Sequence, residues 1–238
     1  MVEEANPPRI SFAAMTRVIL FDIDGTLIRT GGAGQRAFGA AFQSAFGLAD
    51  ACSNTHFAGR TDRGLAADIL AAHQLEPSPG NIQRIFESYL RWLAEFLPAD
   101  HHEPLPGVRD LIVGLRALPE PPAIALLTGN LSRGGKLKLT HFNLWQEFAW
   151  GAFGDIHEAR DDMARYALEL AREKLGADLE PVDLLVIGDT ERDIQCARAI
   201  GARVLAVATG LETRDELAQH KPDFLVEDLN KITAKELA

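Results

Sequence analysis

Four short, continuous runs of apolar residues, each ended by Gly, Asp or Thr, constrain the fold of this chain more than any other feature. They span residues 17–24, 122–130, 183–190 and 202–210. Such runs are typical of strands buried on both faces of a parallel sheet. Helical patterns lie between the later runs, at 108–118, 160–176 and 191–201. The alternation predicts an α/β fold with a doubly wound, Rossmann-like parallel sheet.

One interval departs from this alternation. Between the first and second runs, apolar residues recur at three-to-four spacing without a buried strand, over 35–47, 62–75 and 81–97. This pattern predicts an all-helical cap domain at 31–103, inserted into a core made of 1–30 and 104–238. The glycine-rich stretch 30–34 and the proline-containing stretch 103–107 are the expected hinges.

Charge and composition exclude several classes of partner. The 238 residues include 34 acidic and 24 basic ones, a formal charge of -10, with no basic block. We therefore expect no nucleic acid and no membrane partner. The first residues carry acids and prolines where a secretory signal needs an apolar stretch, and no run reaches bilayer length, so we expect a cytoplasmic protein. The sequence leaves the oligomeric state open.

Acidic side chains follow the ends of the predicted strands. Asp22 and Asp24 end the first run, Asp189 ends the third, and Asp193 lies about one turn into the following helix. Because the carboxyl ends of parallel strands converge at one edge of the sheet, these acids should meet there, together with Thr128 at the end of the second run. Crowded carboxylates need a cation, and oxygen ligands without His or Cys favour Mg²⁺.

A family resemblance rests on the same positions. The stretches DIDGT (22–26), LLTGN (126–130), the basic Arg160 before a helix, and GDTERD (188–193) resemble, in order, the four motifs of the haloacid dehalogenase-like hydrolase superfamily. GRTD (59–62) and LPGV (105–108) resemble its phosphoglycolate-phosphatase-like branch, which carries a helical cap. The third motif usually supplies Lys, and this chain has Arg160 there.

The resemblance implies a Mg²⁺-dependent phosphatase that acts on a small phosphate monoester, with 2-phosphoglycolate as one candidate. Asp22 would be the nucleophile that forms an aspartyl-phosphate, and Asp24 would be the general acid and base. Thr128 and Arg160 would hold the phosphoryl oxygens. The substrate-binding residues it implies are Thr128, Gly129, Asn130, Arg160 and Arg60. The metal would be held by the carboxylates of Asp22 and Asp189 and the carbonyl of Asp24, with Asp193 supporting it.

Arg60 is the cap residue for which we expect a specific role. It lies in AGRTDRG just before a predicted helix, from where its side chain could point across the cleft toward the core acids. A guanidinium matches a carboxylate on the substrate. The alternative is an ordinary surface arginine at a helix start.

Other interpretations compete with this one. Taken singly, Asp24-Gly25 is typical of a turn, and Thr128, Asp189 or Thr190 of a helix cap. A phosphomutase, or another phosphoryl or phosphonyl transferase of the same fold, is a second functional candidate. A dehalogenase has no use for Asp24, and a phospho-receiver signalling domain has no place for the helical insert. Because the acids occur together at successive strand ends, the phosphatase interpretation is the stronger one.

Overall fold

The chain forms a six-stranded sheet, seen in a computed structural model that describes residues 15–97 and 103–237. Its strands are β1 (Val18–Phe21), β2 (Ala123–Thr128), β3 (Gly151–Phe153), β4 (Leu184–Gly188), β5 (Arg203–Val207) and β6 (Phe224–Val226). They lie in the order β3-β2-β1-β4-β5-β6, and all neighbours are parallel. The doubly wound α/β fold predicted from the sequence is confirmed. Parts of the predicted core (1–14 and 238) and insert (98–102) lie outside the described residues.

The four strands expected from the apolar runs occupy the centre of the sheet, as β2, β1, β4 and β5. The two edge strands, β3 and β6, have three residues each and were not predicted. An edge strand needs only one hydrogen-bonded neighbour, so a run this short can pair without a long apolar signature. The centre, which carries the acids, is therefore the part that the sequence defines best.

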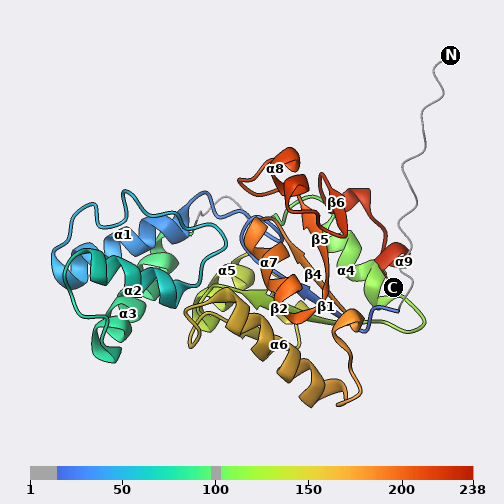
Figure 1. The fold of residues 1–238 in the computed structure, drawn as a ribbon. Helices are drawn as coiled ribbons and strands as arrows, with labels where there is room; N and C mark the ends of the chain where they lie inside the picture. Colours follow the sequence, from blue (N-terminus) through green and yellow to red (C-terminus); the bar gives the residue numbers. More distant parts are fainter. Residues whose placement is uncertain (1–14, 98–102, 238) are drawn as a thin grey trace.

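Helices cover both faces of this sheet (Figure 1). Ile19 and Phe21 of β1 pack into one apolar cluster, while Val18 and Leu20 pack into another. This alternation follows from the two-residue period of a strand. The first cluster includes residues of α4 (Val108–Arg116), α5 (Ser132–His141) and α9 (Ala234–Leu237), and the second residues of α6 (Arg160–Leu175), α7 (Glu191–Ile200) and α8 (Arg214–Gln219). Short 3-10 helices span Trp145–Glu147, Pro181–Asp183 and Leu229–Lys231.

Three further helices lie beside the sheet, at the left of Figure 1: α1 (Ala33–Phe46), α2 (Asp62–Ala72) and α3 (Pro79–Phe96). Their apolar faces form a cluster of their own, which includes Phe38, Phe42 and Tyr89. Leu131, in the loop after β2, and Leu137 of α5 join the sheet unit to this cluster. Helices α1 to α3 fall inside the segment 31–103, whose assignment as a separate cap domain stays a prediction.

Within the described ranges, 15–97 and 103–237, no helix has both the length and the hydropathy that crossing a bilayer requires.

Candidate active site

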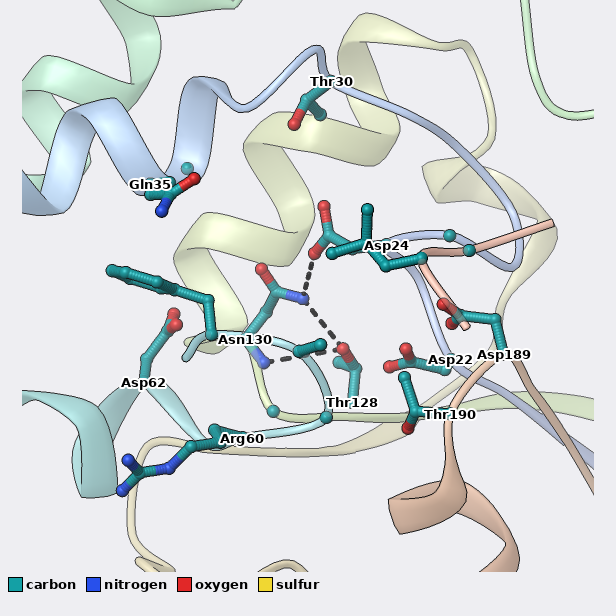
Figure 2. A pocket seen from close by; sticks show the side chains of 18 of the residues that line it. Asp22, Asp24, Thr30, Gln35, Arg60, Asp62, Thr128, Asn130, Asp189 and Thr190 are labelled. Carbon is teal, nitrogen blue, oxygen red and sulfur yellow. Dashed lines mark hydrogen bonds between the residues drawn. The ribbon is translucent and has the colours of Figure 1, made fainter. Parts of the chain in front are cut away.

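The carboxyl ends of β2, β1 and β4 bring three of the expected residues to one edge of the sheet. Asp22 directly follows β1, Thr128 is the last residue of β2, and Asp189 directly follows β4. The backbone N–H of Asp22 donates to the carbonyl of Ile187 at 2.9 Å, so Asp22 continues the pairing of β1 with β4. All three line a cavity of about 350 Å³ between the sheet and helices α1 to α3 (Figure 2).

Three acids form a tight, buried group at this edge. Oxygen atoms of Asp22, Asp189 and Asp193 lie within 4.8 Å of one another. Burial raises the pKa of Asp22 to about 6 and that of Asp189 well above its usual range, and the neighbouring carboxylates add to both shifts. Such a group needs positive charge close by. The carboxylate of Asp24 is not part of it.

Arg160 supplies positive charge to this group from the first turn of α6. Its Nη2 lies 3.2 Å from Oδ1 of Asp22 and donates to Oδ1 of Asp193. Burial lowers the pKa of the guanidinium, but Asp193 and Asp22 outweigh that effect and raise it well above its usual value. The Nε of Arg160 is buried and has no hydrogen-bond partner among the described residues. Because Nε is buried, the Nη groups are the part of the guanidinium that can meet an anion in the cavity, which Arg160 lines.

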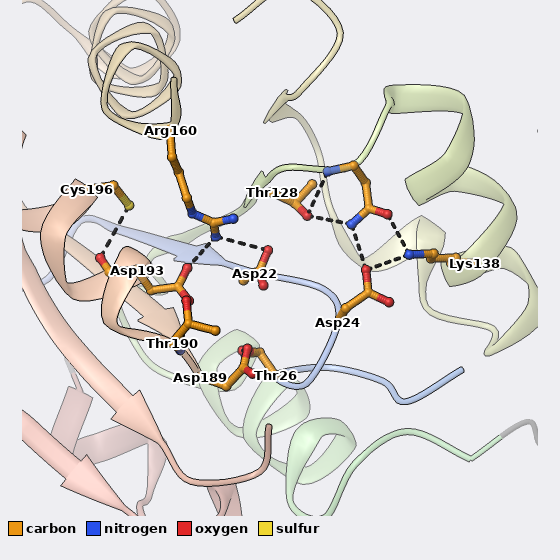
Figure 3. Close-up of polar contacts among 11 residues, drawn as sticks. Asp22, Asp24, Thr26, Thr128, Lys138, Arg160, Asp189, Thr190, Asp193 and Cys196 are labelled. Carbon is orange, nitrogen blue, oxygen red and sulfur yellow. Dashed lines mark hydrogen bonds and ion pairs between the residues drawn. The ribbon is translucent and has the colours of Figure 1, made fainter. Parts of the chain in front are cut away.

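Asp193 owes its position to the start of α7. It accepts hydrogen bonds from the backbone N–H of Thr190 at 3.1 Å and from the Thr190 hydroxyl at 2.7 Å, the geometry of a capping box. Thr190 is therefore the N-cap of α7, as one interpretation of this motif expected, and Asp193 completes the capping box. The same cap also aims the other oxygen of Asp193 at Arg160 (Figure 3).

Asp189 lies in a notch formed by two glycines. A Cβ at Gly25 would lie 2.3 Å from Oδ2 of Asp189, and a Cβ at Gly210 would lie 1.7 Å from the same atom. Gly25 also has φ +86°, a conformation that a residue with a side chain rarely adopts. The hydroxyl of Thr26 donates to Oδ1 of Asp189 at 3.1 Å. The Asp24-Gly25 turn after β1 is thus present, and its glycine leaves room for the carboxylate of Asp189.

Asp24 turns away from the acid group toward a lysine that the sequence analysis missed. Nζ of Lys138 and Nδ2 of Asn130 both donate to Oδ2 of Asp24, at 2.6 and 2.8 Å (Figure 3). Lys138 also donates to Oδ1 of Asn130 at 2.7 Å. A signal for Lys138 was present, because it lies seven residues after the buried Leu131 and so falls on the buried face of α5.

The loop after β2 connects Thr128 to the helical insert. The Thr128 hydroxyl hydrogen-bonds the carboxylate of Asp22 and accepts from Nδ2 of Asn130 at 2.8 Å. Asp62, at the start of α2, donates its backbone N–H to the carbonyl of Gly129 at 2.7 Å and accepts from the N–H of Leu131 at 2.8 Å. This pair of bonds fastens the insert to the loop. Thr61, the residue before it, caps α2 by accepting a hydrogen bond from the backbone N–H of Gly64.

Arg60 does not point where we expected. Its guanidinium pairs with Asp68 on α2 and lies away from the acids, although the residue lines the cavity (Figure 2). The cause is the nearer carboxylate of Asp68. The backbone of Arg60 is also held in place, since a Cβ at Gly129 would lie 1.9 Å from the Arg60 carbonyl oxygen. The substrate-binding role of Arg60 stays a prediction.

Comparison with known proteins gives partial sequence matches and a full match of fold. A family model described as HAD-hydrolase-like matches residues 162–232. Phosphoglycolate phosphatase of Synechococcus elongatus is 29% identical over 63% of this chain and 66% of its own length. Phosphoglycolate phosphatase 1 of Pseudomonas aeruginosa is 28% identical over 56% of this chain and 48% of its own. The chain thus matches less than two thirds of the length of either relative.

The fold match covers nearly the whole chain. The crystal structure of CbbY from Rhodobacter sphaeroides in complex with phosphate superposes with a TM-score of 0.69, at 22% identity, over 90% of this chain and 95% of that one. The fold and the acid group define the class, a Rossmann-like α/β protein with a carboxylate site at the ends of its central strands. The sequence matches point the same way: residues 162–232 match the HAD-hydrolase-like family model, and the chain is similar to phosphoglycolate phosphatases.

Proposed function

We propose that the protein is a phosphatase that hydrolyses a small phosphate monoester through an aspartyl-phosphate on Asp22. The observation that carries this proposal is the surroundings of the Asp22 carboxylate. Arg160 lies on one side of it and the Thr128 hydroxyl hydrogen-bonds it, inside a cavity that Asp24 also lines. The names of the relatives, and the phosphate bound by CbbY, support the same chemistry.

In the first step, an oxygen of Asp22 bonds to phosphorus while the bond to the leaving oxygen breaks, and Asp24 gives that oxygen a proton. In the second step, Asp24 takes a proton from water, the water oxygen bonds to phosphorus, and the bond to Asp22 breaks. Phosphoryl transfer depends mostly on position and charge. Arg160, through its Nη groups, and Thr128 would hold the phosphoryl oxygens in both steps.

Mg²⁺ fits the donor set of this site. Asp22, Asp189 and Asp193 offer carboxylate oxygens within 4.8 Å of one another, with no nitrogen or sulfur ligand among them. We propose that Asp22 and Asp189 bind the ion with the backbone carbonyl of Asp24, and that Asp193 supports them from behind. The bound ion would offset the negative charge of the carboxylates and the phosphate.

The substrate should be small. The cavity of about 350 Å³ also takes in Phe38, Phe57 and Tyr89 of the helical insert, which would surround the leaving group. We propose 2-phosphoglycolate as a candidate on the strength of the phosphatases that the chain resembles. A carboxylate on the substrate is the feature that Arg60 would recognise if its guanidinium left Asp68.

The proposal is tested by phosphate release from a panel of small phosphate esters, with and without Mg²⁺. We expect phosphate release that requires Mg²⁺ and stops after chelation. We also expect Asp22→Asn to abolish the release. Full release by Asp22→Asn, or by the wild type after exhaustive chelation, would contradict the proposal.

A further inference from the structure

Lys138 is a buried cation that the proposed mechanism does not use. Its side chain is 5% exposed, on the face of α5 that meets the helical insert. Its ammonium contacts Oδ2 of Asp24 at 2.6 Å and Oδ1 of Asn130 at 2.7 Å. From the insert, a Cβ at Gly34 would lie 3.4 Å from Nζ, an ordinary contact distance, so the start of α1 lies directly beside the ammonium.

Burying an ammonium is expensive, and packing alone does not require one. Replacing a buried ion pair by apolar groups of similar volume is often neutral or stabilising. A methionine has nearly the length of a lysine and would fill the same space on α5 without a desolvation cost. The charge at position 138 therefore points to a purpose other than stability.

The geometry of Asp24 indicates what that purpose is. Lys138 and Asn130 both bind the same oxygen, Oδ2, while the side chain of Asp24 as a whole is 41% exposed to the cavity. The two donors fix the rotation of the carboxylate and reserve Oδ1 for the reacting groups. Without them, a half-exposed aspartate at the end of a strand would sample several rotamers.

Asn130 extends this arrangement to the phosphate end of the cavity. The amide of Asn130 accepts from Lys138 and donates to both Asp24 and Thr128, and Thr128 hydrogen-bonds Asp22. Lys138 thus orients the Asn130 amide, which bonds to Asp24 directly and is linked to Asp22 through Thr128. A change at Lys138 would disturb Asp24 directly and Thr128 only through Asn130.

We propose that Lys138 is a positioning residue that holds Asp24 with Oδ1 directed at the leaving oxygen. This inference rests on the proposed phosphatase function. In this role Lys138 donates hydrogen bonds and transfers no proton. The proton that Asp24 gives to the leaving oxygen travels from Oδ1 as the phosphorus–oxygen bond breaks. The competing roles for Lys138 are a purely structural cation and a direct ligand of the substrate.

The test compares two esters that differ in their need for a proton. An alkyl phosphate such as glycerol phosphate has a poor leaving group that needs general acid catalysis, whereas p-nitrophenyl phosphate leaves as a stable phenolate. The quantity to compare is kcat/KM, because it reports the first step, in which the leaving group departs and the phosphoenzyme forms. We expect Lys138→Met to lower kcat/KM on glycerol phosphate by about 100-fold, within the range of general acid catalysis, and on p-nitrophenyl phosphate by less than about fivefold.

Two further variants separate positioning from structure. Lys136→Met makes the same change two residues away on α5, where the exposed ammonium lies over the ring of Trp145. It should leave kcat/KM for both esters unchanged. Lys138→Arg keeps a cation that can reach Asp24 and should recover part of the loss on the alkyl ester. Should Lys138→Met fail to fold, as judged by its melting transition, Lys138→Gln serves for the same comparison.

A rapid-mixing measurement examines the second step. Since Asp24 also removes the proton from water, Lys138→Met should show a burst of p-nitrophenol followed by slow turnover. An equal loss of kcat/KM on both esters, no loss on either, or a gain in activity would overturn the positioning role. Failure of the wild type to hydrolyse either ester would instead reject the proposed function itself, so the two failures are distinct.

Discussion

The Nη2 atom of Arg160 lies 3.2 Å from Oδ1 of Asp22, and both side chains are more than nine-tenths buried. The same guanidinium nitrogen donates to Asp193. A single cation thus lies between the proposed nucleophile and the acid that completes the capping box of α7. Arg160 also lines the cavity, where its Nη groups can meet a phosphoryl oxygen.

Arg160→Ala should therefore lower kcat/KM, which corresponds to a loss of about 2–4 kcal/mol of transition-state stabilisation. The transition state loses a charge-assisted donor in a buried site. Arg160→Lys keeps the charge without the planar fork and should fall in between. The melting temperature of each variant is the control, since the alanine change also leaves Asp193 buried without its cation. Activity of Arg160→Ala close to that of the wild type would mean that another residue holds the phosphate.

Gly210 offers a test of the metal site that touches no acid. Its φ is not in the left-handed region, but a Cβ there would lie 1.7 Å from Oδ2 of Asp189. Gly210→Ala should displace that carboxylate and weaken Mg²⁺ binding about tenfold or more. At 100 times its dissociation constant, the ion should stabilise the wild type by about 2.7 kcal/mol and the variant by about 1.4 kcal/mol or less.

The control for this experiment is Gly39→Ala, in α1, where a Cβ would meet no atom within 4 Å. Thermal melts with and without Mg²⁺ give the comparison. Equal stabilisation of Gly210→Ala and Gly39→Ala by Mg²⁺ would remove Asp189 from the metal site.

The sequence predicted the centre of this molecule and missed parts of its periphery, for physical reasons. Strands β1, β2, β4 and β5 are buried on both faces, so their apolar runs are unambiguous. The acids follow those runs, so their meeting at one edge follows from parallel topology. Strands β3 and β6 pair on one side only and carry no such run.

The site details that were missed depend on contacts between distant segments. Helical periodicity places Lys138 on the buried face of α5, but its partner Asp24 lies 114 residues away, and only the fold brings the two together. Arg60 was expected to face the acids, and the nearer Asp68 binds its guanidinium instead. The notch around Asp189 needs glycines after both β1 and β5. The residues next to Gly210 in the sequence do not indicate that it contacts Asp189.

Asp62 predicts a particular dependence of stability on pH. Burial raises the pKa of its carboxyl from 3.8 to about 7, against the opposing effects of Lys138 and the Leu131 N–H. Between about pH 4 and 7, the folded state keeps a proton that the unfolded state has lost. The free energy of unfolding should therefore fall as pH rises through this window, by up to about 4 kcal/mol from this group.

Asp62→Asn removes this titration and keeps an oxygen to accept from Leu131. Denaturant unfolding across pH 4 to 8 should show the variant more stable than the wild type at pH 8, with the difference shrinking toward pH 4. A constant difference over the whole range would contradict the account.

Arg60→Ala tests the recognition of a carboxylate on the substrate. The Arg60–Asp68 pair is partly exposed, with side chains 24% and 67% accessible, so breaking it should cost only about 0–1 kcal/mol. If a substrate carboxylate then binds Arg60, Arg60→Ala will reduce kcat/KM for 2-phosphoglycolate far more than for p-nitrophenyl phosphate. Asp68→Ala, which frees the guanidinium of Arg60, should not lower kcat/KM for 2-phosphoglycolate. Equal losses on both esters would place Arg60 outside the site.

The central claim is that Asp22 carries the phosphoryl group during turnover. Asp24→Asn should slow the release of that group, so acid quenching of this variant with p-nitrophenyl phosphate should trap it. Peptide mass spectrometry should then find one added phosphoryl group, on Asp22, and none in the Asp22→Asn variant. A phosphoryl group on any other residue, or steady hydrolysis by Asp22→Asn, would contradict the account.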